Sequence, residues 1–183
     1  YLDSILSFTH PGYKSELTAY KRALSQRNRL LKQPNTTGAS LFVWDVQLSQ
    51  RAGKIAQLRS DLVTTLQGVC QDHYRSISST QATLNLTYTS KLSLQNYADH
   101  MLAHLRDHVD VDLQRGFTTV GPHRDDLYIE LKDSDARLTA SRGETRSIIL
   151  SLKIAELQLL HDQTGKQYED CRSYRNNRQR WCD

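Results

Sequence analysis

Proline and glycine are scarce in this chain, with 3 and 8 copies among 183 residues. This scarcity argues against a disordered chain, because disordered chains are enriched in both residues. No apolar stretch approaches the ~20 residues that a helix needs to cross a bilayer, and no signal peptide opens the chain. We therefore expect a cytoplasmic protein with no membrane partner.

Cysteine is also rare, and the three copies form no C-x-x-C pair. Cys70, Cys171 and Cys182 are widely spaced, so zinc and redox motifs built on paired cysteines are excluded and reduced thiols are expected. The sequence contains neither a G-x-x-x-x-G-K-[ST] loop nor an apolar strand ending in Asp-Asp or Asp-Glu. These residues alone thus lack the parts that cradle ATP and bind Mg²⁺, and we expect no catalytic residues among them.

Two long segments place apolar residues at spacings of three and four, the pattern of a narrow seam on a helix. The first runs from Tyr13 to Lys32. Its polar residues, including Arg27, are expected on the faces away from the seam. The second runs from near Ser40 to about Ile77. A short loop with Pro34 and Gly38 joins them, which predicts a long antiparallel helix hairpin.

Further elements are expected along the chain. We predict a helical turn over 2–8, a strand over 83–89, a helix over 94–114 capped by Gly116, strands over 127–131 and 137–139, and a helix over 143–162. The final helix has the widest apolar surface and is expected to be the most buried. Residues 166–183 are basic and aperiodic, so we expect a mobile tail. The predicted fold class is α+β and mostly helical.

The segment Ser141-Arg142-Gly143-Glu144 lies where a predicted strand gives way to a helix. Ser141 and Glu144 have the spacing of a capping box, and Gly143 allows an anion to approach the backbone. With Arg142 and Arg146 nearby, the free N–H groups of such a helix start can stabilise a phosphate. An ordinary helix cap explains the same residues and is the simpler interpretation from local chemistry.

Histidines occur in two further clusters. The turn His123, Arg124, Asp125 and Asp126 offers an imidazole beside paired carboxylates, suitable for a metal or a general base. A turn stapled by Arg–Asp pairs is the alternative interpretation. His100, His104 and His108 are spaced by four residues along one helix face and could hold a metal, although solvated histidines account for the same pattern. The spacings match no strong metal motif, so no metal site is predicted.

Several segments, in one order, resemble the RecF family of bacterial DNA replication and repair proteins, ABC-type ATPases related to SMC heads. The matching pieces are Tyr1-Leu2-Asp3, Tyr20 with Leu24 to Lys32, Trp44-Asp45 with Leu48, Gly121 to Leu127, and Ser141 to Arg146 followed by Leu152-Lys153-x-Ala155-Glu156. Together they span roughly nine-tenths of the chain. The match covers the central and later part of that family, without its Walker A and Walker B segments.

This resemblance implies a division into a helical lobe at 1–115, a signature-bearing part of an ATPase core at 116–165, and an unplaced tail at 166–183. It implies that Ser141, Arg142, Gly143, Glu144 and Arg146 form the signature motif, which caps ATP held by another subunit and closes a homodimer. His123 to Asp126 would be an interface turn. Glu144 stands where the family usually has Gln.

The family resemblance also implies partners and a setting: DNA at gaps and single-strand/double-strand junctions, RecR, RecO, recombinase loading, the SOS response, and a nucleoid-associated location in the bacterial cytoplasm. ATP and Mg²⁺ are implied for the longer family proteins, which are weak ATPases, while these 183 residues are expected to bind neither alone and to be inactive. Two other functions stay open. One is a helical protein–protein interaction module, and the other is a metal hydrolase using His123, Asp125 and Asp126.

Overall fold

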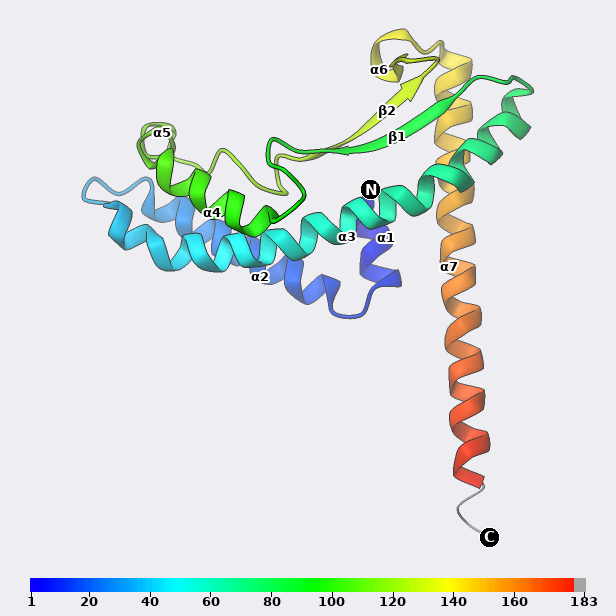
Figure 1. Cartoon of the computed structure of the whole chain (residues 1–183), viewed down its shortest axis with the longest axis horizontal. Coiled ribbons are helices and arrows are strands. Elements are labelled where there is room, and N and C mark those ends of the chain that lie inside the picture. Colours follow the sequence, from blue (N-terminus) through cyan, green and yellow to red (C-terminus); the bar gives the residue numbers. More distant parts are fainter. Residues whose placement is uncertain (180–183) are drawn as a thin grey trace.

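The amino-terminal half of the chain forms a long helix hairpin flanked by a short helix. The computed structural model describes the backbone of residues 1–179 and the side chains of residues 1–162. Helix α1 spans Leu2–Thr9, α2 spans Tyr13–Leu30 and α3 spans Gly38–Ser78. Figure 1 shows α2 lying alongside the first half of α3, with the two helices running in opposite directions. The predicted antiparallel hairpin is therefore confirmed.

The ends of these helices follow from local residue chemistry. Gly12 adopts a left-handed backbone with φ of 84° at the start of α2, a conformation that glycine accepts without strain. Thr37 and Ser40 form a reciprocal capping box, so α3 begins at Gly38, slightly before the predicted start. Phe8, which the pattern placed on the inner face of the first helix, is instead 79% exposed.

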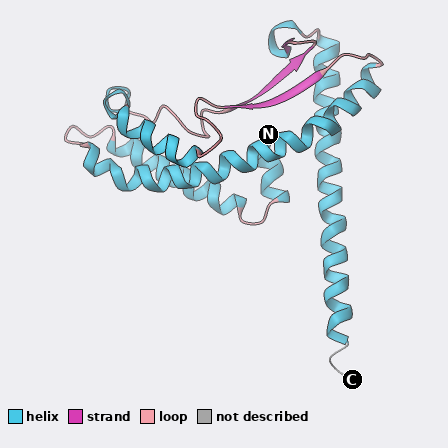
Figure 2. Ribbon diagram, in the orientation of Figure 1, coloured by secondary structure: helices cyan, strands magenta, loops and turns pink. Residues whose placement is uncertain are grey.

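A small antiparallel sheet lies along the second half of α3. Its strands are β1 (Leu84–Thr89), β2 (Asp126–Leu131) and β3 (Ser134–Asp135), in that order. Leu84 pairs with Leu131 and Thr89 with Asp126, so β1 and β2 match along their whole length. Figure 2 shows how small this sheet is beside the helices, which agrees with the predicted mostly helical α+β class.

Two glutamines of α3 hydrogen-bond to the free edge of β1. Gln71 accepts from the Leu84 N–H at 2.5 Å, and Gln67 accepts from the Leu86 N–H at 2.5 Å. The same two amides donate to the carbonyls of Ala82 and Leu84 at 3.2 and 2.9 Å. Because unpaired strand edges tend to recruit other strands, this pairing protects β1 and fixes its position on α3.

The predicted return strand over 137–139 is wrong. Lys132 and Asp133, with φ of 54° and 59°, make the two-residue turn between β2 and β3, and β3 ends after Asp135. The Asp135 carboxylate then accepts from the Arg137 N–H at 2.9 Å, which starts the short helix α6 (Ala136–Thr139). A capping aspartate therefore outweighed the apolar–polar alternation of the following residues.

The helix predicted over 94–114 is divided in two. Helix α4 spans Tyr97–Asp107 and α5 spans Val109–Arg115, with His108 between them at φ −116° and ψ 24°. Gly116 ends α5 with φ of 71°, as the sequence predicted. Gly53 lets α4 approach α3 closely, since a Cβ built there would lie 3.1 Å from the Ala98 Cβ.

Helix α7 (Arg142–Gln179) crosses α3 and runs well beyond the rest of the fold (Figure 1). Its inner face buries Ile148, Leu152 and Ala155. The expectation that this helix is the most buried is wrong, because Ile149, Leu150 and Leu157 on its other side are 54%, 48% and 65% exposed. Its predicted end near residue 162 is also wrong, because helical backbone continues to Gln179.

Residues on both sides of the predicted boundary at 116 share one hydrophobic core, which includes Tyr20, Ile55, Leu84, Leu131 and Ile148. The division into two lobes stays a prediction. So does the mobility of residues 166–183, of which 180–183 lie outside the described residues. Within the described part, no helix combines the length and hydrophobicity that crossing a membrane requires.

Candidate functional site

The first candidate segment, the turn from Gly121 to Asp126, is tightly fixed by its surroundings. Gly121 has φ of 126°, and a Cβ there would lie 2.7 Å from the Tyr20 hydroxyl and 2.8 Å from the Met101 methyl. Both the backbone angle and the space therefore require glycine at this position. Arg59 of α3 donates to the Pro122 carbonyl and holds Asp3 of α1 with contacts of 2.9 and 3.0 Å.

His123 has both ring nitrogens engaged. Its Nε2 lies 3.2 Å from the Thr118 carbonyl, which can only accept, so Nε2 carries the hydrogen. Its Nδ1 then accepts from the Tyr20 hydroxyl at 2.7 Å. Burial of the ring nitrogens, with Arg124 nearby, lowers the pKa of His123. The neutral imidazole is thus a structural bridge between α2 and the turn, with no lone pair left for a metal.

The acidic residues of the turn also have protein partners. The Asp125 Oδ2 accepts from the hydroxyls of Tyr88 and Tyr97 at 2.7 and 2.8 Å, and Asp126 pairs with Arg137 at 3.1 Å. Arg124 lies over the Phe117 ring, 5.0 Å from its centroid. One Arg–Asp pair therefore staples the turn, made by Arg137 rather than Arg124, while Asp125 is held by two tyrosines.

No metal site is supported in the described part of the chain. No three His, Cys, Asp or Glu side chains are grouped there to hold an ion. The His104 and His108 rings stack on each other at 4.0 Å, and His108 lies at the helix break rather than on a continuous stripe. The arrangement needed by a metal hydrolase at His123, Asp125 and Asp126 is likewise not formed.

A groove of about 430 Å³ opens beside this turn, between α1, α2 and β1. Tyr20, Tyr88 and Leu24 are among its walls. The charged residues that line it are of both signs: Asp3, Asp125, Asp126, Lys21 and Arg59. This mixture does not select an anionic or a cationic ligand.

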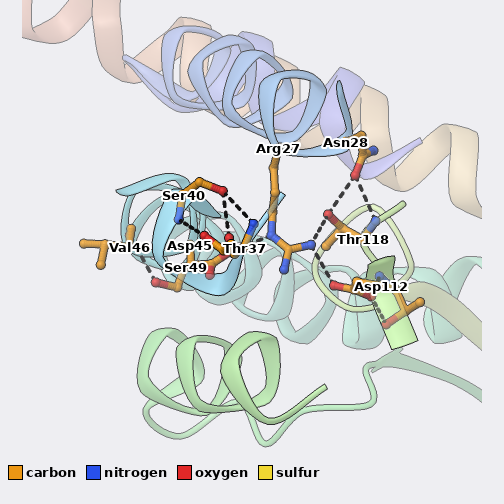
Figure 3. Close-up of polar contacts among 10 residues, drawn as sticks. Arg27, Asn28, Thr37, Ser40, Asp45, Val46, Ser49, Asp112 and Thr118 are labelled. Carbon is orange, nitrogen blue, oxygen red and sulfur yellow. Dashed lines mark hydrogen bonds and ion pairs between the residues drawn. The ribbon is translucent and has the colours of Figure 1, made fainter. Parts of the chain in front are cut away.

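Sequence reasoning missed a buried ionic cluster below the same turn. Arg27, placed on a polar face by its charge, is fully buried, as are Asp45 and Asp112. Figure 3 shows Arg27 extending from α2 toward both carboxylates. Its Nε lies 2.6 Å from Asp45, and its Nη1 lies 2.7 Å from Asp112 and 2.9 Å from the Thr118 hydroxyl.

The cluster ties the helix hairpin to the segment that precedes the turn. Thr118 donates its N–H and hydroxyl to Asn28, both at 2.8 Å, and Asp112 accepts from Thr119. Burial raises the pKa of Asp45 despite the opposing effect of Arg27. One signal was available in the sequence: Arg27 continues the seven-residue spacing of Tyr13 and Tyr20, both of which face the core.

The second candidate segment starts α7, and its local structure is as predicted. Ser141 caps the helix: its Oγ accepts from the Glu144 N–H at 3.3 Å, and its own N–H donates to Glu144 Oε2 at 2.9 Å. Within the described residues, the N–H groups of Arg142 and Gly143 have no acceptor. A Cβ at Gly143 would meet only the Ser141 Oγ, at 4.0 Å. The helix start is thus open to a ligand, and Arg142 and Arg146 are exposed beside it.

Glu144 has a second partner that sequence reasoning did not find. Lys132, in the turn between β2 and β3, donates to Glu144 Oε1 at 2.7 Å. This contact, with the hydrogen bonds from Ser141, lowers the pKa of Glu144 to about 2. The carboxylate is therefore ionised at neutral pH and is held by groups on both of its oxygens.

The two candidate segments lie on one continuous piece of structure. The turn leads into β2, and the β2–β3 turn contacts the start of α7 through Lys132. Arg137, just before Ser141, pairs with Asp126. The hairpin therefore presents an open, capped helix start at the base of the long helical arm α7.

Two solved structures of a recombination mediator protein are similar to this chain. The structure of the recombination mediator protein RecF with ATP in the RecFOR pathway superposes with a TM-score of 0.83 at 29% sequence identity, over 90% of this chain and 46% of that one. A second structure, of RecF-ATPrS, gives a TM-score of 0.81 at 28% identity with the same coverage. No protein-family model matches the chain.

Curated relatives carry the name DNA replication and repair protein RecF. The chain is 33% identical over 167 residues to the protein of Clostridium beijerinckii, 37% over 175 to that of Heliobacterium modesticaldum and 38% over 166 to that of Deinococcus radiodurans. These matches cover 90–92% of this chain but 44–47% of the relatives. The predicted resemblance to RecF is confirmed, and the chain spans about half the length of the relatives it matches.

Proposed function

We propose that this chain supplies the signature half of a composite ATP site in a RecF-like DNA repair ATPase. The observation that carries the proposal is the start of α7, where Ser141 caps the helix and the N–H groups of Arg142 and Gly143 remain free within the described residues. Such groups favour a phosphate through direct hydrogen bonds and the helix dipole. The ATP named with the solved RecF structure supports this choice of ligand.

In this proposal the rest of the site comes from another polypeptide. As the family resemblance implies, a G-x-x-x-x-G-K-[ST] loop of the opposing subunit holds the ATP phosphates and Mg²⁺. ATP then joins two surfaces and closes a dimer. Ser141, Arg142, Gly143 and Arg146 contact the terminal phosphate, whereas His123 to Asp126 shape the neighbouring turn without taking part in chemistry.

The wider role we propose is recombinational repair: binding to DNA at gaps and junctions, assembly with RecR and RecO, and loading of recombinase. The relatives' names support replication and repair, and the RecFOR pathway named with the solved structure supports the two protein partners.

The test is complementation of a dimer. The chain is mixed with a full-length RecF relative in which the serine aligned with Ser141 is replaced by arginine, and sedimentation velocity is recorded with ATP and Mg²⁺. We expect an ATP-dependent complex that Ser141→Arg in this chain abolishes, because a bulky cation would fill the space beside Gly143. A mixture that stays monomeric, while the unaltered relative dimerises with ATP, would refute the proposal.

Two controls accompany this experiment. Thr64→Arg adds the same bulky charge at an exposed position of α3 and should leave the complex intact. The purified chain alone should release no phosphate from ATP, and measurable turnover would contradict the expected lack of catalytic residues.

A different function, a helical interaction module without nucleotide, would give a different pattern. The exposed apolar face of α7 at Ile149, Leu150 and Leu157 is the observation in its favour. In that case Leu157→Asp would remove a protein partner in pull-down experiments, while ATP and Ser141→Arg would have no effect on capture.

A further inference from the structure

Glu144 is an unexpected neighbour for a phosphate. Its ionised carboxylate lies at the start of α7, within one helical turn of the free N–H groups of Arg142 and Gly143. An unpaired carboxylate there would repel an anionic ligand, since like charges at close range disfavour each other. Whatever compensates this charge therefore decides whether the helix start can accept ATP.

Lys132 is the group that compensates it. Its Nζ lies 2.7 Å from Glu144 Oε1, while Glu144 Oε2 is held by the Ser141 N–H at 2.9 Å. The lysine hydrogen bond sets the position of one oxygen and the cap sets the other. The carboxylate is thereby turned toward the hairpin and the cap, leaving the Arg142 and Gly143 N–H groups uncovered.

The backbone at Lys132 gives no local reason for a lysine. Its φ of 54° is in the left-handed region, which two-residue hairpin turns normally fill with Asn, Asp or Gly. Lysine is uncommon there because its side chain crowds the backbone. What distinguishes the residue in this structure is the contact of its ammonium group with Glu144.

We propose that Lys132 is a positioning residue for the start of α7: it neutralises Glu144 and holds it against the Ser141 cap, so that the pair presents no net charge to the terminal phosphate of ATP. This rests on the function proposed above. A single neutral amide at position 144 would also present an uncharged surface to the phosphate. Here two oppositely charged residues from different elements provide it.

The pair contributes little to folding, which makes its effect on the ligand separable. Lys132 is 61% exposed and Glu144 is 27% exposed, and exposed ion pairs have small effects on stability. Loss of Lys132 should therefore leave the fold intact and expose a negative charge at the phosphate site. We expect about fivefold weaker ATP-dependent association, the size typical of one close charge in a solvent-accessible place.

The experiment compares four forms of the full chain: unaltered, Lys132→Asn, Glu144→Gln, and the two combined. Asparagine suits the left-handed turn, so the fold should be preserved, and circular dichroism checks this. Its side chain is too short to reach Glu144, so the contact is lost. Each form is titrated against the signature-deficient RecF relative with ATP and Mg²⁺, and the dissociation constant is measured by sedimentation. A titration with ADP in place of ATP is the ligand control.

Each outcome decides the proposal. Weakening of about fivefold by Lys132→Asn, with no weakening when Glu144→Gln is also present, supports it. Equal weakening in both backgrounds overturns it, because Lys132 would then act on the ligand or the fold directly. No weakening also overturns it while leaving the proposed function standing. Failure of the unaltered chain to associate with ATP overturns the proposed function and this inference with it.

Discussion

At the scale of single residues, Arg27 links the helix hairpin to the segment that precedes the turn. It is a buried cation between two buried carboxylates, at 2.6 and 2.7 Å. Such a pair adds little net stability compared with apolar residues, because both charges lose their hydration. We expect its contribution to be specificity, because Asp45 and Asp112 are satisfied by Arg27 only when α2, α3 and the segment before the turn pack in this arrangement.

Removing this cation alone should be severe. We expect Arg27→Leu to lower the free energy of unfolding by about 3–5 kcal/mol, since two buried carboxylates would lose the cation that balances their charge. Urea denaturation followed by circular dichroism measures this loss. Arg29→Leu, on the exposed side of the same helix, is the matched control and should change stability by about 0.5 kcal/mol or less. Equal losses in both variants would disprove the role of the cluster.

His123 should make stability depend on pH. Its pKa is lowered in the folded protein, so the unfolded chain binds more protons below the ordinary pKa of about 6.5. The stabilisation that the neutral ring contributes is therefore fully present above the unfolded-state pKa. It is lost as the pH falls toward the lower pKa of the folded protein. We expect the free energy of unfolding to rise between acidic and neutral pH, and His123→Gln to flatten this rise. An unchanged profile in the variant would contradict the assignment.

His104 also has a lowered pKa, from burial and from His108, and contributes in the same direction. For that reason the decisive quantity is the difference between the unaltered and His123→Gln profiles. The variant His104→Gln should leave that difference in place.

At the scale of elements, the two helices of the long hairpin were predictable, whereas the later helices and the sheet were predicted only in part. Helices α2 and α3 could be predicted because apolar residues spaced by three and four form a narrow face that a helix buries against a second helix. The prediction of a return strand was wrong because three residues are too few to define an alternating pattern. The Asp135 side chain instead caps a short helix there. Arg27 could not be placed inside from its charge alone, since the carboxylates that compensate it come from 18 and 85 residues away along the chain. Lys132 and Glu144 are likewise joined only by the folded hairpin.

The two glycines inside α3 should respond oppositely to alanine. A Cβ at Gly68 would meet no atom within 4 Å, so Gly68→Ala should add about 0.8–1 kcal/mol from helix propensity. At Gly53 the Ala98 Cβ would lie 3.1 Å from the added methyl group, so Gly53→Ala should gain much less or lose stability as α4 is pushed from α3. Thermal unfolding of both variants checks this. Equal stabilisation would show that the approach of α4 is not constrained by Gly53.

At the scale of the whole molecule, the long helix α3 joins the helix hairpin to the start of α7 in one packed unit. The long helix α3 contacts α2, α4 and β1, and α7 crosses its second half (Figure 1). A movement at the start of α7 therefore has a packed route to the hairpin through α3. In the proposed function, this route would couple closure of the ATP-dependent dimer to the surface that meets DNA.

Binding to DNA should be led by phosphate contacts, given a net charge of +4 and the basic residues on the exposed side of α2. Neutralised phosphates release counterions, so about four such contacts would weaken binding roughly 100-fold between about 50 and 200 mM salt. Fluorescence anisotropy with a gapped duplex measures this slope. Arg22→Ala should reduce the slope by about 1, whereas Gln26→Ala on the same helix should not change it. Binding that ignores ionic strength would exclude a phosphate-led interface, because no contact with the backbone of DNA can avoid displacing its counterions.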